Sequence, residues 1–240
     1  MWDSELQFAD SFEIYLHGRG KALGQQGKGA MVLREYAPGY GRVDVVMVVY
    51  DVNRLKERQR RTPSHQKSGD LDIWGAYAMA YLTHTRWVSI KTLSKKLNIG
   101  LARARKLISH LEHRGLVETR DDLVKAYSRQ ANFVIDYIEA FELKLKNWKF
   151  ALEQACRHLW FASRSYVVMP SKSETVSRRL SLNCSTLKIG AILCESKDSW
   201  ETICYPPQAI VPTSTVGYLL NEAIVIGAEN GRLSTFSSGH

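Results

Sequence analysis

Two short charged motifs, each set against an apolar segment, constrain this chain more than any other feature. Near the N-terminus, Gly41-Arg42-Val43-Asp44 leads directly into the apolar run Val45-Val46-Met47-Val48-Val49. Far downstream, a second segment with strand character carries Phe141-Glu142-Leu143-Lys144. Because successive side chains of a strand alternate between faces, Glu142 and Lys144 share one face. Charged groups in or beside a buried sheet are costly, and they therefore indicate a functional site.

The types of residue in these motifs point to a particular chemistry. Hydrolysis of a phosphodiester needs a divalent metal, an attacking water and neutralisation of charge on the leaving oxygen. Mg²⁺ prefers oxygen ligands and is usually held by one or two protein carboxylates, which Asp44 and Glu142 would supply. Lys144 would orient or deprotonate the water, or offset charge on the phosphate, and the sequence leaves these roles open. The expected cofactor is Mg²⁺, with Mn²⁺ as a substitute.

The positive charge of the chain is concentrated in one central block. The whole chain carries a net charge of +9, and residues 54–130 hold 17 Lys and Arg against 7 Asp and Glu. The remainder holds 16 basic and 17 acidic residues, so it is almost neutral. A segregated basic block is typical of a protein that binds a polyanion. The alternative is a solvated basic surface without a partner.

Residues 70–128 have the pattern of a small DNA-binding domain. Asp70 or Asp72 is positioned to cap a helix that runs through Tyr81. A second helix is expected over 89–97, and a third over about 101–114, ended by a glycine at position 115. The following residues through 125 would form a wing hairpin. This order of elements is that of a winged helix-turn-helix.

The basic residues of these two helices are the expected DNA contacts. The third helix would present Arg103, Arg105 and Lys106 to the major groove. The second helix would present Lys91, Lys95 and Lys96 to phosphates. Two alternatives remain at this point: a plain three-helix insert, and a winged helix that contacts protein.

The rest of the chain alternates between helical and strand patterns. A glycine-rich polar loop over 18–29 has no strand before it and no Gly-Lys-Ser/Thr ending, so an ATP site is rejected. We expect an amphipathic helix over 3–17, strands over 30–36, 43–51, 133–145, 165–170 and 189–194, a helix from 148 to about 163, a helix over 173–183, a helix or strand over 214–228, and a loose tail over 234–240.

These motifs together resemble the PD-(D/E)XK nuclease superfamily over roughly 1–52 and 130–200. The resemblance implies an α/β fold with a restriction-endonuclease-like mixed sheet flanked by helices. It also implies that Asp44, Glu142 and the Leu143 carbonyl hold the metal. An acidic residue on the first helix often completes the family's site, and here it would be Glu5 or Glu13, with Glu5 preferred.

The resemblance extends to a helix that follows the second motif. Several members carry Gln-x-x-x-Tyr on the crossover helix near the site. This chain reads Gln154-Ala155-Cys156-Arg157-His158, so Gln154 matches and is a candidate catalytic residue, whereas histidine replaces the tyrosine. The role of His158 is therefore open. Val43 also stands where the family name has proline.

The two halves of the expected nuclease site are unusually far apart in the sequence. Surface loops tolerate insertions best, so we expect the winged helix to be inserted in such a loop. The predicted domains are a first nuclease part over 1–53, a basic linker over 54–69, a winged-helix insert over 70–130 and a second nuclease part over 131–240.

The sequence therefore predicts a Mg²⁺-dependent DNA endonuclease that is delivered to DNA by the winged helix. The alternative is a catalytically inactive, nuclease-like DNA-binding regulator or assembly subunit. DNA is the expected partner, with a homodimer by analogy and a protein partner in a larger system as further options. The sequence shows no membrane-spanning run, signal peptide or zinc spacing of its four cysteines, so we expect a cytoplasmic protein without a membrane partner. Substrate form, sequence specificity and pathway (restriction, phage defence or repair) stay open.

Overall fold

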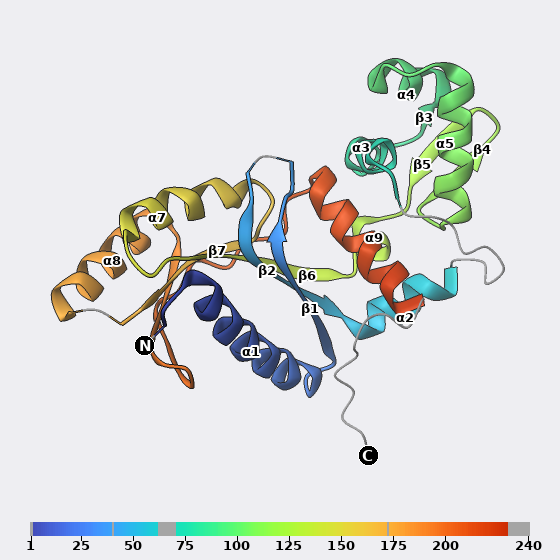
Figure 1. Cartoon of the computed structure of the whole chain (residues 1–240). Coiled ribbons are helices and arrows are strands. Elements are labelled where there is room, and N and C mark those ends of the chain that lie inside the picture. The colour runs from blue at the N-terminus through green and yellow to red at the C-terminus, as the bar shows by residue number, and fades with distance from the viewer. Residues whose placement is uncertain (1, 40, 62–70, 172, 230–240) are drawn as a thin grey trace. The chain divides into compact units, whose positions relative to one another are not determined.

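The chain divides into two compact units, which are seen in the computed structural model of Figure 1. The structure describes residues 2–39, 41–61, 71–171 and 173–229. Among these, unit 1 contains residues 2–50 and 135–212, and unit 2 contains residues 51–134 and 213–229. The chain therefore leaves unit 1 after its second strand and returns to it at position 135.

Unit 1 is built on a six-stranded mixed sheet with the order β1-β2-β6-β7-β8-β9. Strands β2 and β6 are antiparallel, β6, β7 and β8 are parallel to one another, and β9 is antiparallel to β8. The expected mixed α/β architecture with a sheet flanked by helices is confirmed. The strands are β1 (Lys28–Tyr36), β2 (Val43–Asp51), β6 (Ile135–Leu143), β7 (Arg164–Pro170), β8 (Gly190–Ser196) and β9 (Ser199–Cys204).

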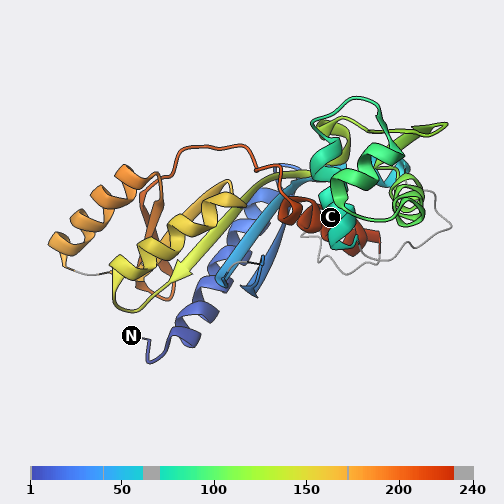
Figure 2. The same cartoon turned by 90° about the horizontal axis from the view of Figure 1, so that it is seen from above.

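Helices cover both faces of this sheet (Figure 1). Helix α1 (Glu5–Gly24) packs on one face, while α7 (Trp148–Arg157) and α8 (Glu174–Leu187) pack on the other. Seen from above in Figure 2, α7 runs alongside strand β6. The helix expected to run from 148 to about 163 ends earlier, because residues His158–Trp160 form a short 3-10 turn, η1, instead.

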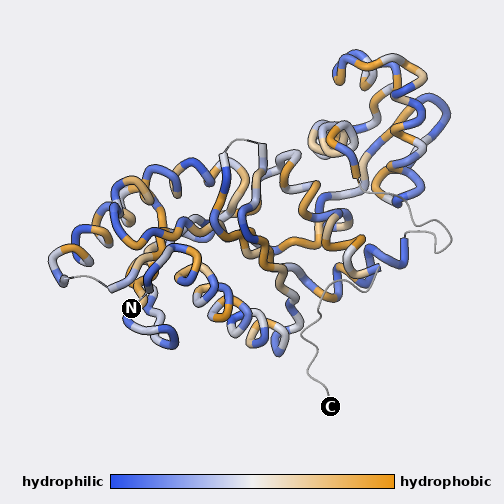
Figure 3. Tube along the Cα trace, in the orientation of Figure 1, coloured by the Kyte–Doolittle hydropathy of each residue, from blue (hydrophilic) through white to orange (hydrophobic). Residues whose placement is uncertain are grey.

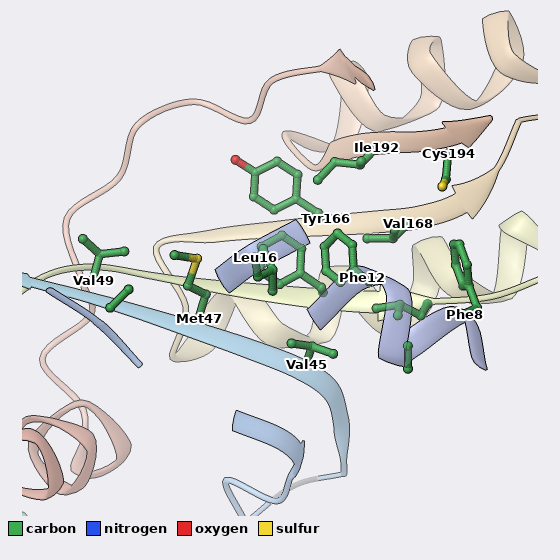
Figure 4. Packing of buried hydrophobic residues seen from close by; sticks show 14 residues of the cluster. Phe8, Phe12, Leu16, Val45, Met47, Val49, Tyr166, Val168, Ile192 and Cys194 are labelled. Atoms are coloured by element: carbon green, nitrogen blue, oxygen red, sulfur yellow. The ribbon is translucent and has the colours of Figure 1, made fainter. Parts of the chain in front are cut away.

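The hydrophobic core on the α1 face explains why this helix forms. Phe8, Phe12 and Leu16 are fully buried, and their spacing of four places them in one stripe against the sheet (Figure 4). Each such side chain contributes about 1.5–3 kcal/mol when buried. In Figure 3, α1 alternates between hydrophobic and hydrophilic residues along its length, as an amphipathic helix does.

Helix α1 is longer than the sequence pattern predicted. The polar loop expected over 18–29 is wrong for its first part, because residues 18–24 continue the helix. Gly20 is buried and Leu23 packs against the core, so the apolar stripe continues at spacings of four and three. The cap at the start is Ser4, whose side chain accepts a hydrogen bond from the backbone N–H of Gln7 at 3.2 Å.

Unit 2 is mainly helical and holds a small three-stranded antiparallel sheet of order β3-β5-β4. Asp72 caps its helix α3, and Gly115, at a φ of +62°, follows the end of α5, as predicted. The elements are α2 (Val52–Arg61), α3 (Ile73–Leu82), β3 (Val88–Ser89), α4 (Ile90–Leu97), α5 (Leu101–His113), β4 (Val117–Arg120), β5 (Leu123–Ala126), α6 (Arg129–Asn132) and α9 (Thr215–Glu229).

Two further predicted assignments differ from the structure. Residues 54–61 of the expected basic linker lie in helix α2, because Leu55 and Arg58 are buried on one side of it; residues 62–69 lie outside the described residues. The segment 214–228 is helical, and it belongs to unit 2 rather than to the second nuclease part. The expected loose tail over 234–240 also lies outside the described residues.

A buried ion cluster explains why α2 and α9 join unit 2. The carboxylate of Glu222 on α9 lies 3.5 Å from the guanidinium of Arg58 on α2 and also accepts hydrogen bonds from Arg114. Nearby, Asn221 accepts a hydrogen bond from the backbone N–H of Val134 at 2.7 Å.

No described helix of the chain is long and apolar enough to cross a membrane.

Candidate metal-dependent active site

The three charged residues of the two sequence motifs come together in unit 1. Strands β2 and β6 pair with Val45 opposite Phe141, which places Asp44 opposite Glu142 at the next position. The Asp44 carboxylate accepts hydrogen bonds from the backbone N–H of Leu143 at 2.8 Å and from Lys144 Nζ at 3.3 Å. The pairing of the strands therefore fixes Asp44 at the second motif.

Glu142 is the most unusual residue of this cluster. Its side chain is fully buried, and Oε1 lies 2.6 Å from Nε2 of His158. Oε2 has no hydrogen-bond partner among the described residues and lies 3.7 Å from Lys144 Nζ. Burial raises the pKa of the Glu142 carboxyl, and nearby Asp44 adds to this, while His158 and Lys144 act in the opposite direction.

Lys144 connects the two carboxylates. Burial alone would lower the pKa of its ammonium group, but Asp44, Glu142 and Glu5 outweigh burial, so the pKa is raised. Lys144 therefore stays an ammonium ion at neutral pH in this geometry. It places one positive charge between two negative ones.

The two candidate acids on helix α1 have different surroundings. Glu5 lines an open cavity of about 160 Å³ together with Asp44 and Leu143. Glu13 lies about two helical turns further along α1, 3.6 Å from Arg34 and 3.5 Å from His17. The structure thus brings Glu5, and not Glu13, to the cavity beside the carboxylate cluster.

Helix α7 and the turn after it supply the other candidate residues. Gln154 has a buried side-chain oxygen, Oε1, without a hydrogen-bond partner among the described residues. His158 is one helical turn further on and is buried against Glu142. The spacing of four in the Gln-x-x-x-His pattern was the sequence signal that put both residues on one helix face. The contact of His158 with Glu142 on β6 was not visible in the sequence.

These residues fit a small divalent cation. No group of three or more His, Cys, Asp or Glu side chains that could hold a metal is found in the described parts of the chain. Mg²⁺, however, is usually held through only one or two carboxylates and keeps several waters. Asp44, Glu142 and the carbonyl of Leu143 would be such a set, and Oε2 of Glu142 is a buried oxygen without a hydrogen-bond partner among the described residues.

The six expected DNA contacts are exposed on two helices of unit 2. Lys91, Lys95 and Lys96 lie on α4, and Arg103, Arg105 and Lys106 lie on α5. Their environments differ. The guanidinium of Arg103 lies over the ring of Trp74 at 5.0 Å, Arg105 is 3.3 Å from Asp122, and Lys96 lies over Tyr81 at 5.8 Å.

Comparison of the chain with protein-family models, with curated proteins and with solved structures found no match. The geometry of these residues is therefore the basis for a function.

Proposed function

We propose that this protein is a Mg²⁺-dependent DNA nuclease of the PD-(D/E)XK type, with a restriction-endonuclease-like core in unit 1 and an inserted winged helix in unit 2. One observation supports this proposal more than any other. Glu142 is fully buried, keeps one oxygen without a hydrogen-bond partner among the described residues, and shares Lys144 with Asp44.

The energetic cost of this arrangement supports a functional role. A buried oxygen without a partner costs about 1–3 kcal/mol, and the great majority of buried polar groups in proteins are paired. A cation bound between Glu142 and Asp44 would remove this cost. The site is therefore better explained as a ligand-binding arrangement than as a structural ion pair.

Each residue has a distinct role in the proposed reaction. Asp44, Glu142 and the Leu143 carbonyl hold the metal, which when bound supplies Lewis-acid activation of a water and of the phosphate. Lys144, as an ammonium ion, neutralises negative charge on the phosphate. His158 holds Oε1 of Glu142 and so leaves Oε2 directed to the metal. Glu5 lines the cavity beside Asp44, and Gln154, with its unpartnered Oε1, is the further candidate on α7.

The order of elements in unit 2 supports the proposed winged helix. Helix α3, strand β3, helices α4 and α5, and the hairpin of β4 and β5 follow one another as in that motif. Helix α5 exposes several cations, as a recognition helix would. A winged helix in unit 2 would deliver the nuclease to DNA.

A second function has one observation in its favour. Lys144 already balances Asp44 and Glu142, and the described residues hold no metal-binding group of three side chains. A nuclease-like scaffold that only binds DNA, as a regulator or an assembly subunit, would show these features too. It predicts salt-sensitive DNA binding without metal-dependent turnover.

Cleavage of plasmid DNA separates the two functions. Supercoiled and linear DNA are incubated with Mg²⁺ or Mn²⁺ and with wild type, Lys144→Ala or the control Lys146→Ala, which changes an exposed lysine of the following loop. We expect cleavage by wild type and by the control, and none by Lys144→Ala. DNA binding without cleavage by all three proteins would favour the second function. Equal cleavage by all three would overturn the site assignment.

A further inference from the structure

Unit 2 contains a pocket that is lined by two of the expected major-groove contacts, Arg103 and Lys106, together with residues that those contacts do not account for. It has a volume of about 340 Å³ and lies between the start of α3 and one side of α5. This volume is near the lower end of the range for small-ligand pockets. The residues that line it are Asp72, Trp74, Arg103, Lys106, Leu107 and His110.

The pocket combines positive charge with an aromatic ring. Arg103, Lys106 and His110 are three and four residues apart on α5, so they form one row along the helix. Leu107, which is buried, provides an apolar wall. The one acidic residue, Asp72, already accepts a hydrogen bond from the backbone N–H of Gly75 at 2.7 Å as the cap of α3. An anion with a flat apolar part is therefore the chemistry that fits.

The stacking of Arg103 on Trp74 shows how such a group would be accommodated. The guanidinium lies 5.0 Å from the centre of the indole ring, and such a contact at an exposed site contributes about 0.5–1 kcal/mol. Stacking of a nucleobase on an aromatic side chain contributes about 1–3 kcal/mol. A phosphate that draws Arg103 into a charge-assisted hydrogen bond would free the ring face for a base. Both new contacts, the phosphate with Arg103 and the base with Trp74, are favourable.

We propose that this pocket binds one unpaired nucleotide of a DNA strand, with the base on Trp74 and the phosphate at Arg103 and Lys106. In the interior of a duplex the faces of the bases are covered by their neighbours, whereas a single-stranded tail, flap or branch offers an unpaired base to the ring. The inference rests on DNA binding by unit 2, and it adds the substrate class: duplex DNA with an adjoining unpaired segment. Lys91, Lys95 and Arg105 do not line the pocket and stay available to the duplex.

Binding measured by fluorescence anisotropy in EDTA tests this proposal separately from cleavage. The full chain is titrated into a blunt duplex and into the same duplex with a short single-stranded tail. Wild type is compared with Trp74→Ala, with Trp74→Phe, and with Tyr77→Ala as a control. Tyr77 is a half-exposed neighbour on the same helix that does not line the pocket.

We expect wild type to prefer the tailed duplex by about fivefold or more, the net gain of stacking over the lost cation–π contact. Trp74→Ala should lose this preference and keep the affinity for the blunt duplex. Trp74→Phe and Tyr77→Ala should keep most of the preference. Deoxyadenosine monophosphate should compete with the tail, while inorganic phosphate at the same concentration should compete less.

Several results would overturn the proposal. A wild type that binds both DNAs equally, or a Trp74→Ala variant that keeps the preference, excludes an unpaired base in the pocket. Competition by inorganic phosphate as strong as that by the nucleotide would reduce the pocket to an anion site. Deoxyadenosine monophosphate bound in a Trp74-dependent way, with no effect of the tail, would assign the pocket to a free nucleotide. Failure of wild type to bind either DNA would instead contradict DNA binding by unit 2.

Discussion

Strand β6 carries two fully buried glutamates, which differ in how many hydrogen bonds their carboxylates accept. Glu139 accepts hydrogen bonds from Arg19 at 3.0 Å, from Arg164 at 3.3 Å and from the hydroxyl of Tyr166 at 3.2 Å. Glu142, three residues further on, has one oxygen with His158 and the other without a hydrogen-bond partner among the described residues. The odd spacing directs the two side chains to opposite faces of the sheet.

The difference shows that burial of a carboxylate does not by itself indicate function. Both carboxylate oxygens of Glu139 accept hydrogen bonds from residues of α1 and β7, so Glu139 holds these elements against β6. Oε2 of Glu142 has the ammonium of Lys144 at 3.7 Å but accepts no hydrogen bond from the described residues. We therefore assign a structural role to the first and a ligand-binding role to the second, and each of the following experiments tests this division.

The largest effect is expected from Glu142→Gln. The substitution keeps the shape of the side chain but removes the charge that would hold the metal. Cleavage should fall by at least about a thousandfold, because several kcal/mol of transition-state stabilisation are lost. The free energy of unfolding, measured by urea denaturation, should change by less than about 1 kcal/mol. Retained cleavage would contradict the assignment.

The matched variant Glu139→Gln should lose stability and keep cleavage. It leaves the guanidinium groups of Arg19 and Arg164 without a carboxylate, and loss of one partner of a buried ion pair costs about 3 kcal/mol. The free energy of unfolding should fall by this amount. Cleavage per folded molecule, measured below the unfolding transition, should stay close to wild type. A loss of cleavage without a loss of stability would remove the contrast between the two residues.

His158 sharpens the comparison, because it distinguishes a positioned carboxylate from one that is merely buried. His158→Ala should weaken Mn²⁺ binding by about 10- to 100-fold, the usual effect of losing a residue that orients a metal ligand. His158→Gln, which can still donate a hydrogen bond to Glu142, should restore part of the affinity. Equal affinity of both variants and wild type, measured by calorimetry, would show that His158 only fills space.

A smaller effect is expected in the pH dependence of stability without metal. Burial raises the pKa of Glu142, so the folded state binds its proton more tightly than the unfolded state does. The free energy of unfolding should therefore fall as the pH rises from the unfolded-state pKa through the higher folded-state pKa. In EDTA, Glu142→Gln should lack this component. Identical pH profiles of wild type and Glu142→Gln would argue against a raised pKa of Glu142 in the folded protein.

The sequence predicted which charged residues lie together in unit 1 better than it predicted the surrounding fold, and the reasons are physical. Strand alternation is a local property and placed Glu142 and Lys144 on one face, whereas Asp44, on another strand, was joined to them by the family resemblance. The contacts of Glu139 come from residues 120 and 25 positions away, and no local pattern reveals them. Helix α2 was expected as a linker because its many charges hide its two buried residues. The assignment of α9 to unit 2 depends on long-range contacts of Asn221 and Glu222.

Titration calorimetry with Mn²⁺ tests the central claim most directly, because it measures the metal site without relying on cleavage. We expect wild type and Glu139→Gln to bind Mn²⁺ with similar affinity, provided that both are folded at the temperature used. Glu142→Gln should show no binding in the same range. Equal binding by all three proteins, or no binding by wild type, would contradict a metal site at Glu142.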